Sequence, residues 1–134
     1  MLYLQLLTII FCLLVPLQVR AGHPIKDLLD VRVPAKLDGS AYSVEEVKRA
    51  IIAGAQRRGW TPRLEGDSKI IASILVRSRH YAEVEIAFTA TSYSITYRDS
   101  RELDYDKDTR EIHGNYNKWV NNLSDSIQKE FGLQ

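Results

Sequence analysis

The fold is decided by one continuous stretch, 70-IIASILVRSRHYAEVEIAFTATSYSITYR-98. Apolar and polar residues alternate along it in three runs, at residues 70–77, 81–88 and 92–98. A period of two is typical of strands that bury one face. Because only short turns separate the runs, we expect neighbouring strands to pair as an antiparallel meander.

A fourth, shorter strand is expected over residues 60–65. It should lie at an edge of the sheet, because Pro62 cannot donate a backbone hydrogen bond to a neighbour. The outward positions of the meander carry polar groups, which include Arg77, Glu83, Glu85 and Thr96. We therefore expect that face to be solvated.

Two amphipathic helices flank the meander. Ser43 and Glu46 have the spacing of a capping box, which predicts a helix over residues 43–58. Its apolar stripe is Val44, Val47, Ile51 and Ala55. A second helix is predicted from about Asn115 to Phe131. Its stripe is Tyr116, Trp119 or Val120, Leu123, Ile127 and Phe131.

These elements predict an α+β fold, in which an antiparallel four-stranded meander carries two helices on one face. The single α+β domain should span residues 43–134. Residues 22–42 are predicted to form an extended arm with a possible N-terminal strand, which Pro34 ends. Residues 99–112 are rich in charge and are expected to form a loop.

Residues 1–21 are predicted to be a signal peptide. They include 16 apolar residues and no charged side chain before Arg20. Val19 and Ala21 fit the pattern that a signal peptidase accepts, so cleavage is expected after Ala21, with a periplasmic or secreted product. The alternative is an uncleaved single-pass membrane anchor, since this run is long enough to span a bilayer.

The chain that follows the leader is formally neutral, with 17 Lys and Arg against 17 Asp and Glu. A nucleic-acid partner is therefore not expected, and a membrane partner only if the leader is uncleaved. Cys12, the one cysteine, lies in the leader, so a cleaved chain has no thiol chemistry. No cofactor motif is present, and the run from Asp104 to Asp108 lacks the glycine and glutamate of a calcium loop, so we expect neither cofactor nor metal.

Candidate binding residues gather in the second half of the chain. Two arginines, Arg77 and Arg79, stand beside His80 in a predicted turn and could hold a phosphate or carboxylate; alternatively, the charges of this tip pair with Glu83 or Glu85. His113 precedes the second helix and could act as a base, or could bond a backbone group at the helix entry. Aromatic and amide side chains could line a groove for a glycan or peptide where the charged loop meets this helix. The tentative binding set is Arg79, His80, Arg98, Tyr105, His113, Asn115, Tyr116 and Asn117.

Several spaced motifs resemble a family of small exported bacterial proteins, many labelled only as hypothetical proteins or lipoproteins. The motifs are 93-YSITYRDS-100, 103-LDY-105 and 112-IHGNYNKW-119, with 58-RGW-60 and 79-RHYA-82 before them. The resemblance covers residues 43–127 and implies a location in the bacterial envelope, without implying an activity. The chain departs from the lipoprotein pattern because Cys12 is not preceded by the small residues of a processing site.

The sequence thus favours an exported envelope protein that acts as a non-enzymatic binding module for a protein, peptide or glycan. One alternative is a small periplasmic hydrolase that uses His80 or His113 with Ser100 or an acidic loop residue. Another is a membrane-anchored accessory subunit of an envelope complex.

Overall fold

The computed structural model describes residues 22–132, so the predicted signal peptide at residues 1–21 lies outside the described residues. The described chain forms seven strands and two helices. In chain order they are β1 (Gly22–Pro24), β2 (Leu28–Arg32), α1 (Val44–Arg57), β3 (Thr61–Leu64), β4 (Lys69–Val76), β5 (His80–Phe88), β6 (Ser92–Arg101), β7 (Glu111–His113) and α2 (Asn115–Phe131).

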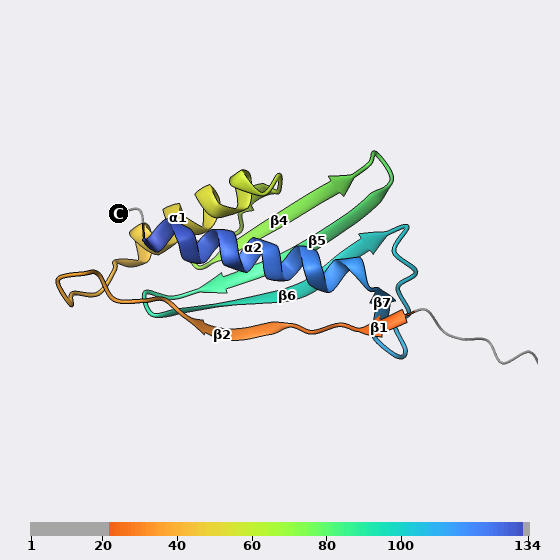
Figure 1. Ribbon diagram of the computed structural model, residues 1–134, viewed down its shortest axis with the longest axis horizontal. Helices are drawn as coiled ribbons and strands as arrows, with labels where there is room; N and C mark the ends of the chain where they lie inside the picture. Colours follow the sequence, from red (N-terminus) through yellow and green to blue (C-terminus); the bar gives the residue numbers. More distant parts are fainter. Residues whose placement is uncertain (1–21, 133–134) are drawn as a thin grey trace, which may run out of the picture.

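A two-layer arrangement confirms the predicted α+β fold. Five antiparallel strands follow the order β2-β6-β5-β4-β3, and both helices lie side by side across one face of this sheet (Figure 1). Strands β3 to β6 are the predicted meander. The count of four strands is too low by one, because the possible N-terminal strand is real and pairs with β6 as β2. Strands β1 and β7 form a separate ribbon.

The prediction of a loop over residues 99–112 is wrong at both ends, because each end belongs to a strand. Strand β6 continues to Arg101 through a bulge, in which Arg98 is the extra residue between Tyr97, the partner of Val84, and Asp99, the partner of Glu83. The bulge interrupts the alternation that marks the strand in the sequence. At the other end, residues 111–113 become β7 through pairing with β1, a contact that no local pattern reveals.

Helix α1 starts with the predicted capping box. Ser43 Oγ accepts from Glu46 N at 3.1 Å, and Ser43 N donates to Glu46 Oε1 at 3.1 Å. The predicted apolar stripe is wrong at Val44, which is 42% exposed. Ala50 and Gly54 take buried positions on the helix instead.

The two helices approach most closely at Gly54. A Cβ atom added there would lie 2.7 Å from Ile127 Cα, closer than real Cβ atoms come to backbone. Ser126 Oγ donates to the carbonyl oxygen of Gly54 at 2.8 Å, which adds a direct hydrogen bond across the same contact. The absence of a side chain at Gly54 therefore lets both helices share one face of the sheet.

Gly54→Ala should destabilise the protein by about 1–3 kcal/mol, because the new methyl group must push α2 away from α1. The matched control is Gly132→Ala, since a Cβ there would make only an ordinary contact at 3.6 Å. Urea unfolding of both variants measures the difference. An equal midpoint for G54A and G132A would contradict this account of the helix contact.

Stability should also depend on the charge of Glu46. Its carboxylate pairs with Lys36 Nζ at 2.9 Å and accepts from Ser43 N, and these contacts hold the pKa of Glu46 below its ordinary value. A lowered folded-state pKa gives stability that is present at neutral pH and lost as pH falls below about 4.5. Glu46→Gln keeps a capping amide but removes the charge, so it should be less stable than wild type at pH 7. The gap should close in unfolding curves measured at lower pH; a gap independent of pH would contradict the assignment.

Candidate functional site

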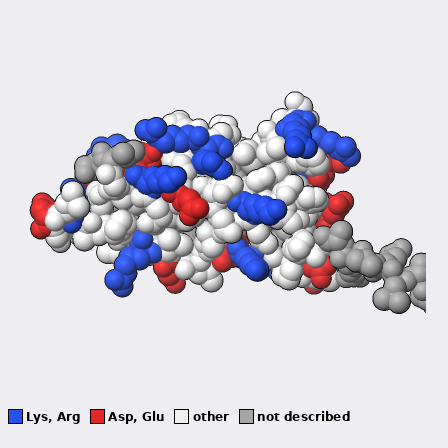
Figure 2. All heavy atoms as spheres, in the orientation of Figure 1, with Lys and Arg blue, Asp and Glu red and all other residues white. Residues whose placement is uncertain are grey.

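The turn between β4 and β5 has Arg77 and Ser78 at its centre, where a two-residue hairpin turn usually has a glycine. Its central residues, Arg77 and Ser78, have φ angles of 53° and 55°, and Arg79 N donates to Val76 O at 3.2 Å. This geometry matches a type I′ turn, for which Asn-Gly is the usual sequence. The left-handed backbone conformation is strained for most other residues. Figure 2 shows basic side chains at this projecting tip. The turn thus holds Arg77 near His80, the first residue of β5.

His80 is oriented by the loop that follows β6. Its Nδ1 lies 2.8 Å from the backbone oxygen of Glu102. Because a carbonyl oxygen can only accept, Nδ1 is the donor, and the neutral ring then carries its lone pair on Nε2.

His113 has the opposite arrangement. Asn115 N donates to His113 Nδ1 at 3.1 Å, so the neutral ring carries its proton on Nε2. His113 N also donates to Leu103 O at 2.8 Å, which fixes the backbone of β7 against the loop. The contact with Asn115 N is the one expected of a residue at a helix entry.

Both imidazoles border one cavity of about 240 Å³, which we call the histidine cavity. Its walls come from the β4–β5 hairpin, the loop after β6, the end of β7 and the first turns of α2. They consist of Val76, Arg77, His80, Leu103, His113, Asn115 and Trp119. The tertiary structure therefore brings together three of the predicted binding residues, His80, His113 and Asn115, from distant parts of the chain.

The described lining of the histidine cavity includes no carboxylate and no hydroxyl or thiol group. Nucleophilic catalysis needs such a group within hydrogen-bonding reach of its base. Ser100, the serine considered for that role, instead shares a 2.7 Å hydrogen bond with the Tyr97 hydroxyl. The described lining of the cavity therefore offers ligand-binding groups without a hydroxyl, thiol or carboxylate nucleophile.

A second cavity, of about 460 Å³, adjoins the first at the start of α2, and we call it the basic cavity. It is lined by His23, Lys26, His113, Gly114, Asn115, Asn117 and Lys118. Because His113 and Asn115 line both cavities, the two share a wall. The three histidines of the chain all lie on this pair of cavities.

Asn117 uses its side chain to hold the N-terminal arm against α2. Its Nδ2 donates to Pro24 O at 2.9 Å, and its Oδ1 accepts from Lys26 N at 3.0 Å. The amide thereby satisfies two backbone groups as a neighbouring strand would. Asn117 thus positions Lys26 in the wall of the basic cavity.

Tyr105 and Tyr116, two further predicted binding residues, pack around Tyr97 and line neither cavity. The rings of Tyr97 and Tyr105 stack with their centres 4.3 Å apart, and Tyr116 meets Tyr97 edge-on at 5.7 Å. Tyr116 is only 1% exposed. Burial raises the pKa of both Tyr97 and Tyr116, so their hydroxyl groups stay protonated at neutral pH. The aromatic side chain that lines the histidine cavity is Trp119.

Arg79 pairs with Glu102 at 3.5 Å, and both side chains are largely exposed. The expected pairing of the turn with Glu83 or Glu85 is wrong. These two carboxylates lie on the helix-free face of the sheet and pair there with Arg63, Lys69 and Arg98.

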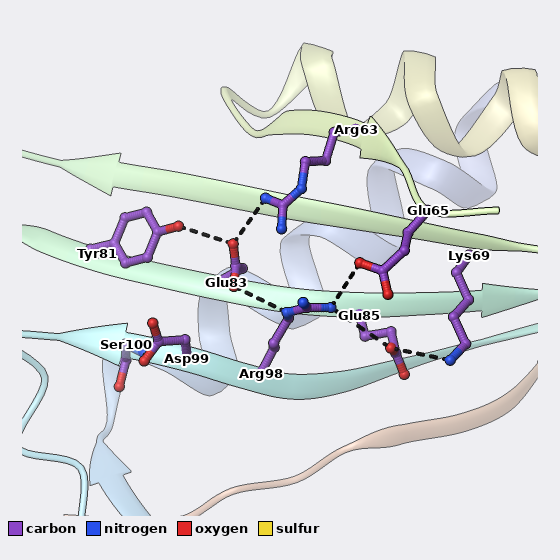
Figure 3. A network of polar contacts seen from close by, with 9 residues as sticks. All are labelled: Arg63, Glu65, Lys69, Tyr81, Glu83, Glu85, Arg98, Asp99 and Ser100. Atoms are coloured by element: carbon purple, nitrogen blue, oxygen red, sulfur yellow. Dashed lines mark hydrogen bonds and ion pairs between the residues drawn. The ribbon is translucent and has the colours of Figure 1, made fainter.

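Arg98 belongs to this network on the helix-free face (Figure 3). Its guanidinium lies 3.3 Å from Glu83 and 3.1 Å from Glu65. Glu83 also accepts from Arg63 at 3.1 Å and from the Tyr81 hydroxyl at 3.2 Å. Arg98 therefore lies in a set of charges on strands β3 to β6, and it does not line the histidine cavity.

Contrary to the prediction, the helix-free face is not exposed to solvent at every position, because Ile71 is buried beneath the network. Ile71 points to the helix-free face, because its neighbour Ile70 points into the core, yet Ile71 is fully buried. Its partners across the strands are Arg63 and Glu85, whose long side chains belong to the network. Their aliphatic portions shield Ile71 while their charged ends stay near water. The face is polar at its surface and apolar just beneath.

No family model, curated protein or solved structure matches this chain. Among residues 22–132, no three His, Cys, Asp or Glu side chains gather in a way that could hold a metal ion. Neither described helix is long and apolar enough to cross a membrane.

The predicted binding set omits four cavity residues: His23, Lys26, Arg77 and Lys118. The sequence places Arg77 with Arg79 beside His80 in the predicted turn, and the two-residue turn between strands is the signal that places it at the tip. No local signal identifies His23 or Lys26, because they reach the site only through the pairing of β1 with β7.

Arg98 and Glu83 should stabilise the protein jointly. A double-mutant cycle with Arg98→Ala and Glu83→Ala should give a coupling free energy of about 1 kcal/mol in urea unfolding, because Glu83 is largely buried. The exposed pair Glu45–Lys48 on α1 is the control and should give no more than about 0.5 kcal/mol. Equal coupling in the two pairs would contradict a special role for the network.

Proposed function

We propose that this protein is an exported component of the bacterial envelope that binds a ligand, and that the histidine cavity accepts an acidic group of that ligand. The apolar leader and the resemblance to exported bacterial proteins support the location. The composition of the cavity supports the binding role.

The observation that carries the proposal is the set of free polar groups around the histidine cavity. Arg77, the Nε2–H of neutral His113, the Asn115 amide and the Trp119 indole all supply donors. Within residues 22–132, these groups have no hydrogen-bond or ion-pair partner. Donors that line one cavity with no carboxylate in its described lining favour an anion, and a guanidinium can bind a carboxylate through two hydrogen bonds.

The second candidate is a small periplasmic hydrolase. It is favoured by the shared cavity of His80 and His113 and by the lone pair that neutral His80 presents on Nε2. It requires a nucleophile from outside the described lining, such as a bound water. Loss of turnover in both His80→Ala and His113→Ala would support it. A membrane-anchored accessory subunit depends on an uncleaved leader, which N-terminal sequencing of the protein from cells tests by the presence or absence of Gly22 as first residue.

A carboxylate on a sugar ring provides a direct test of the binding role. In an NMR titration of the exported protein, galacturonate should shift the side-chain signals of His80, His113 and Trp119, whereas galactose, the same ring without the carboxylate, should not. Arg77→Gln should weaken binding at least tenfold, since a hydrogen bond between charged groups contributes about 1.5–3 kcal/mol. Arg58→Gln, an exposed change after α1, is the matched control. Equal shifts with galactose, or equal binding by R77Q and R58Q, would overturn the proposal.

A further inference from the structure

We infer that the ligand is an acidic oligosaccharide with at least two acidic groups, which runs from the histidine cavity into the basic cavity. This inference rests on the proposed function and extends it from one acidic group to a ligand class. The two cavities are treated below as one basic groove, defined by the residues that line them.

The two parts of the basic groove adjoin each other. His113 and Asn115 form the wall that its two parts share, and both residues are exposed. Figure 1 shows how this arises: the β4–β5 hairpin, β7, β1 and the start of α2 all lie at the same end of the sheet. A ligand group beside Arg77 can therefore be followed along the same surface by a second group near Lys26 and Lys118.

Charge along the groove is of one sign. The charged side chains of its described lining are Arg77, Lys26 and Lys118, and no Asp or Glu lines it. The three Lys and Arg side chains form no ion pair within residues 22–132. A concave surface lined by positive charge attracts anionic ligands.

Two acidic residues close to the groove, Asp27 and Glu102, pair with other side chains. Asp27, next to Lys26, pairs with Arg110 at 3.1 Å and accepts from Tyr97 N at 3.0 Å. Glu102, whose backbone holds His80, pairs through its side chain with Arg79. These pairings draw the carboxylates of Asp27 and Glu102 toward Arg110 and Arg79, which do not line the groove.

The walls of the basic cavity are held in place before any ligand arrives. Asn117 fixes the backbone of Lys26 by hydrogen bonding. The His23 ring lies so close to Gly114 that an added Cβ would sit 2.9 Å from its Cδ2. Groups that are already fixed lose little freedom on binding, which favours affinity.

A saccharide fits the chemistry of the groove better than a peptide. The histidine cavity, at about 240 Å³, is smaller than a typical pocket for a drug-sized molecule and suits one ring. Trp119 is half-buried there, so part of its ring can cover one face of a sugar while the Asn115 amide meets hydroxyl groups. The basic cavity offers charge and amides, with no large apolar side chain in its described lining for a peptide side chain to contact.

The test compares galacturonate with its linked disaccharide, digalacturonate, by calorimetry and NMR on the exported protein. Because the second acidic group binds intramolecularly, digalacturonate should bind at least tenfold more tightly than galacturonate. Lys26→Gln with Lys118→Gln should remove this gain, so that the double variant binds the two ligands with similar affinity. Arg77→Gln should weaken both ligands. Lys129→Gln, an exposed change at the other end of α2, is the control.

The outcomes separate the two proposals. If galacturonate does not bind, the proposed function fails. If galacturonate binds but digalacturonate binds no more tightly, only the extended groove is overturned. If N-acetyl-Asp-Asp-amide binds more tightly than digalacturonate, the saccharide is the wrong class and an acidic peptide replaces it. Circular dichroism and thermal unfolding of each variant separate lost binding from lost folding.

Discussion

The arrangement of the whole molecule depends on the contact between α1 and α2 at Gly54. Because Gly54 has no side chain, the backbone of α2 can lie against α1, and Ser126 can bond the Gly54 carbonyl. Two helices packed this closely cover one face of the five-stranded sheet and leave the other face without helices. The same packing sets the position of α2 along the sheet, and its first turn therefore lies beside the β4–β5 hairpin.

The uncovered face shows how a sheet without a second layer can still protect an apolar residue. Charged side chains from β3, β4, β5 and β6, together with Glu65 between β3 and β4, form a connected set of ion pairs on the face to which Ile71 points. Isolated surface ion pairs contribute little to stability, but a network with a largely buried member such as Glu83 is more constrained. Arg98 therefore serves the ion-pair network on this face, although an arginine at this position was a reasonable candidate for binding.

The candidate site is assembled from parts of the chain that lie far apart in sequence. The hairpin supplies Arg77 and His80, the ribbon of β1 and β7 supplies His23 and His113, the link from β1 to β2 supplies Lys26, and α2 supplies Asn115 and Trp119. The sequence pointed to His80, His113 and Asn115 because histidines and amides carry chemistry and stood near predicted element ends. It also pointed to Tyr105 and Tyr116, which serve packing, since an aromatic residue beside a helix looks the same in sequence whether it is buried or exposed.

The sequence by itself determined the local elements: the alternation in residues 70–98 gave the meander, and Ser43 with Glu46 marked the start of α1. These features depend on neighbours within a few residues, which is why they can be read without a structure. Only the tertiary structure decided that β1 pairs with β7, that a bulge carries β6 to Arg101, and that all three histidines border one groove. Those outcomes depend on contacts between residues far apart in the chain. Such contacts produce no regular spacing of apolar and polar residues in the sequence.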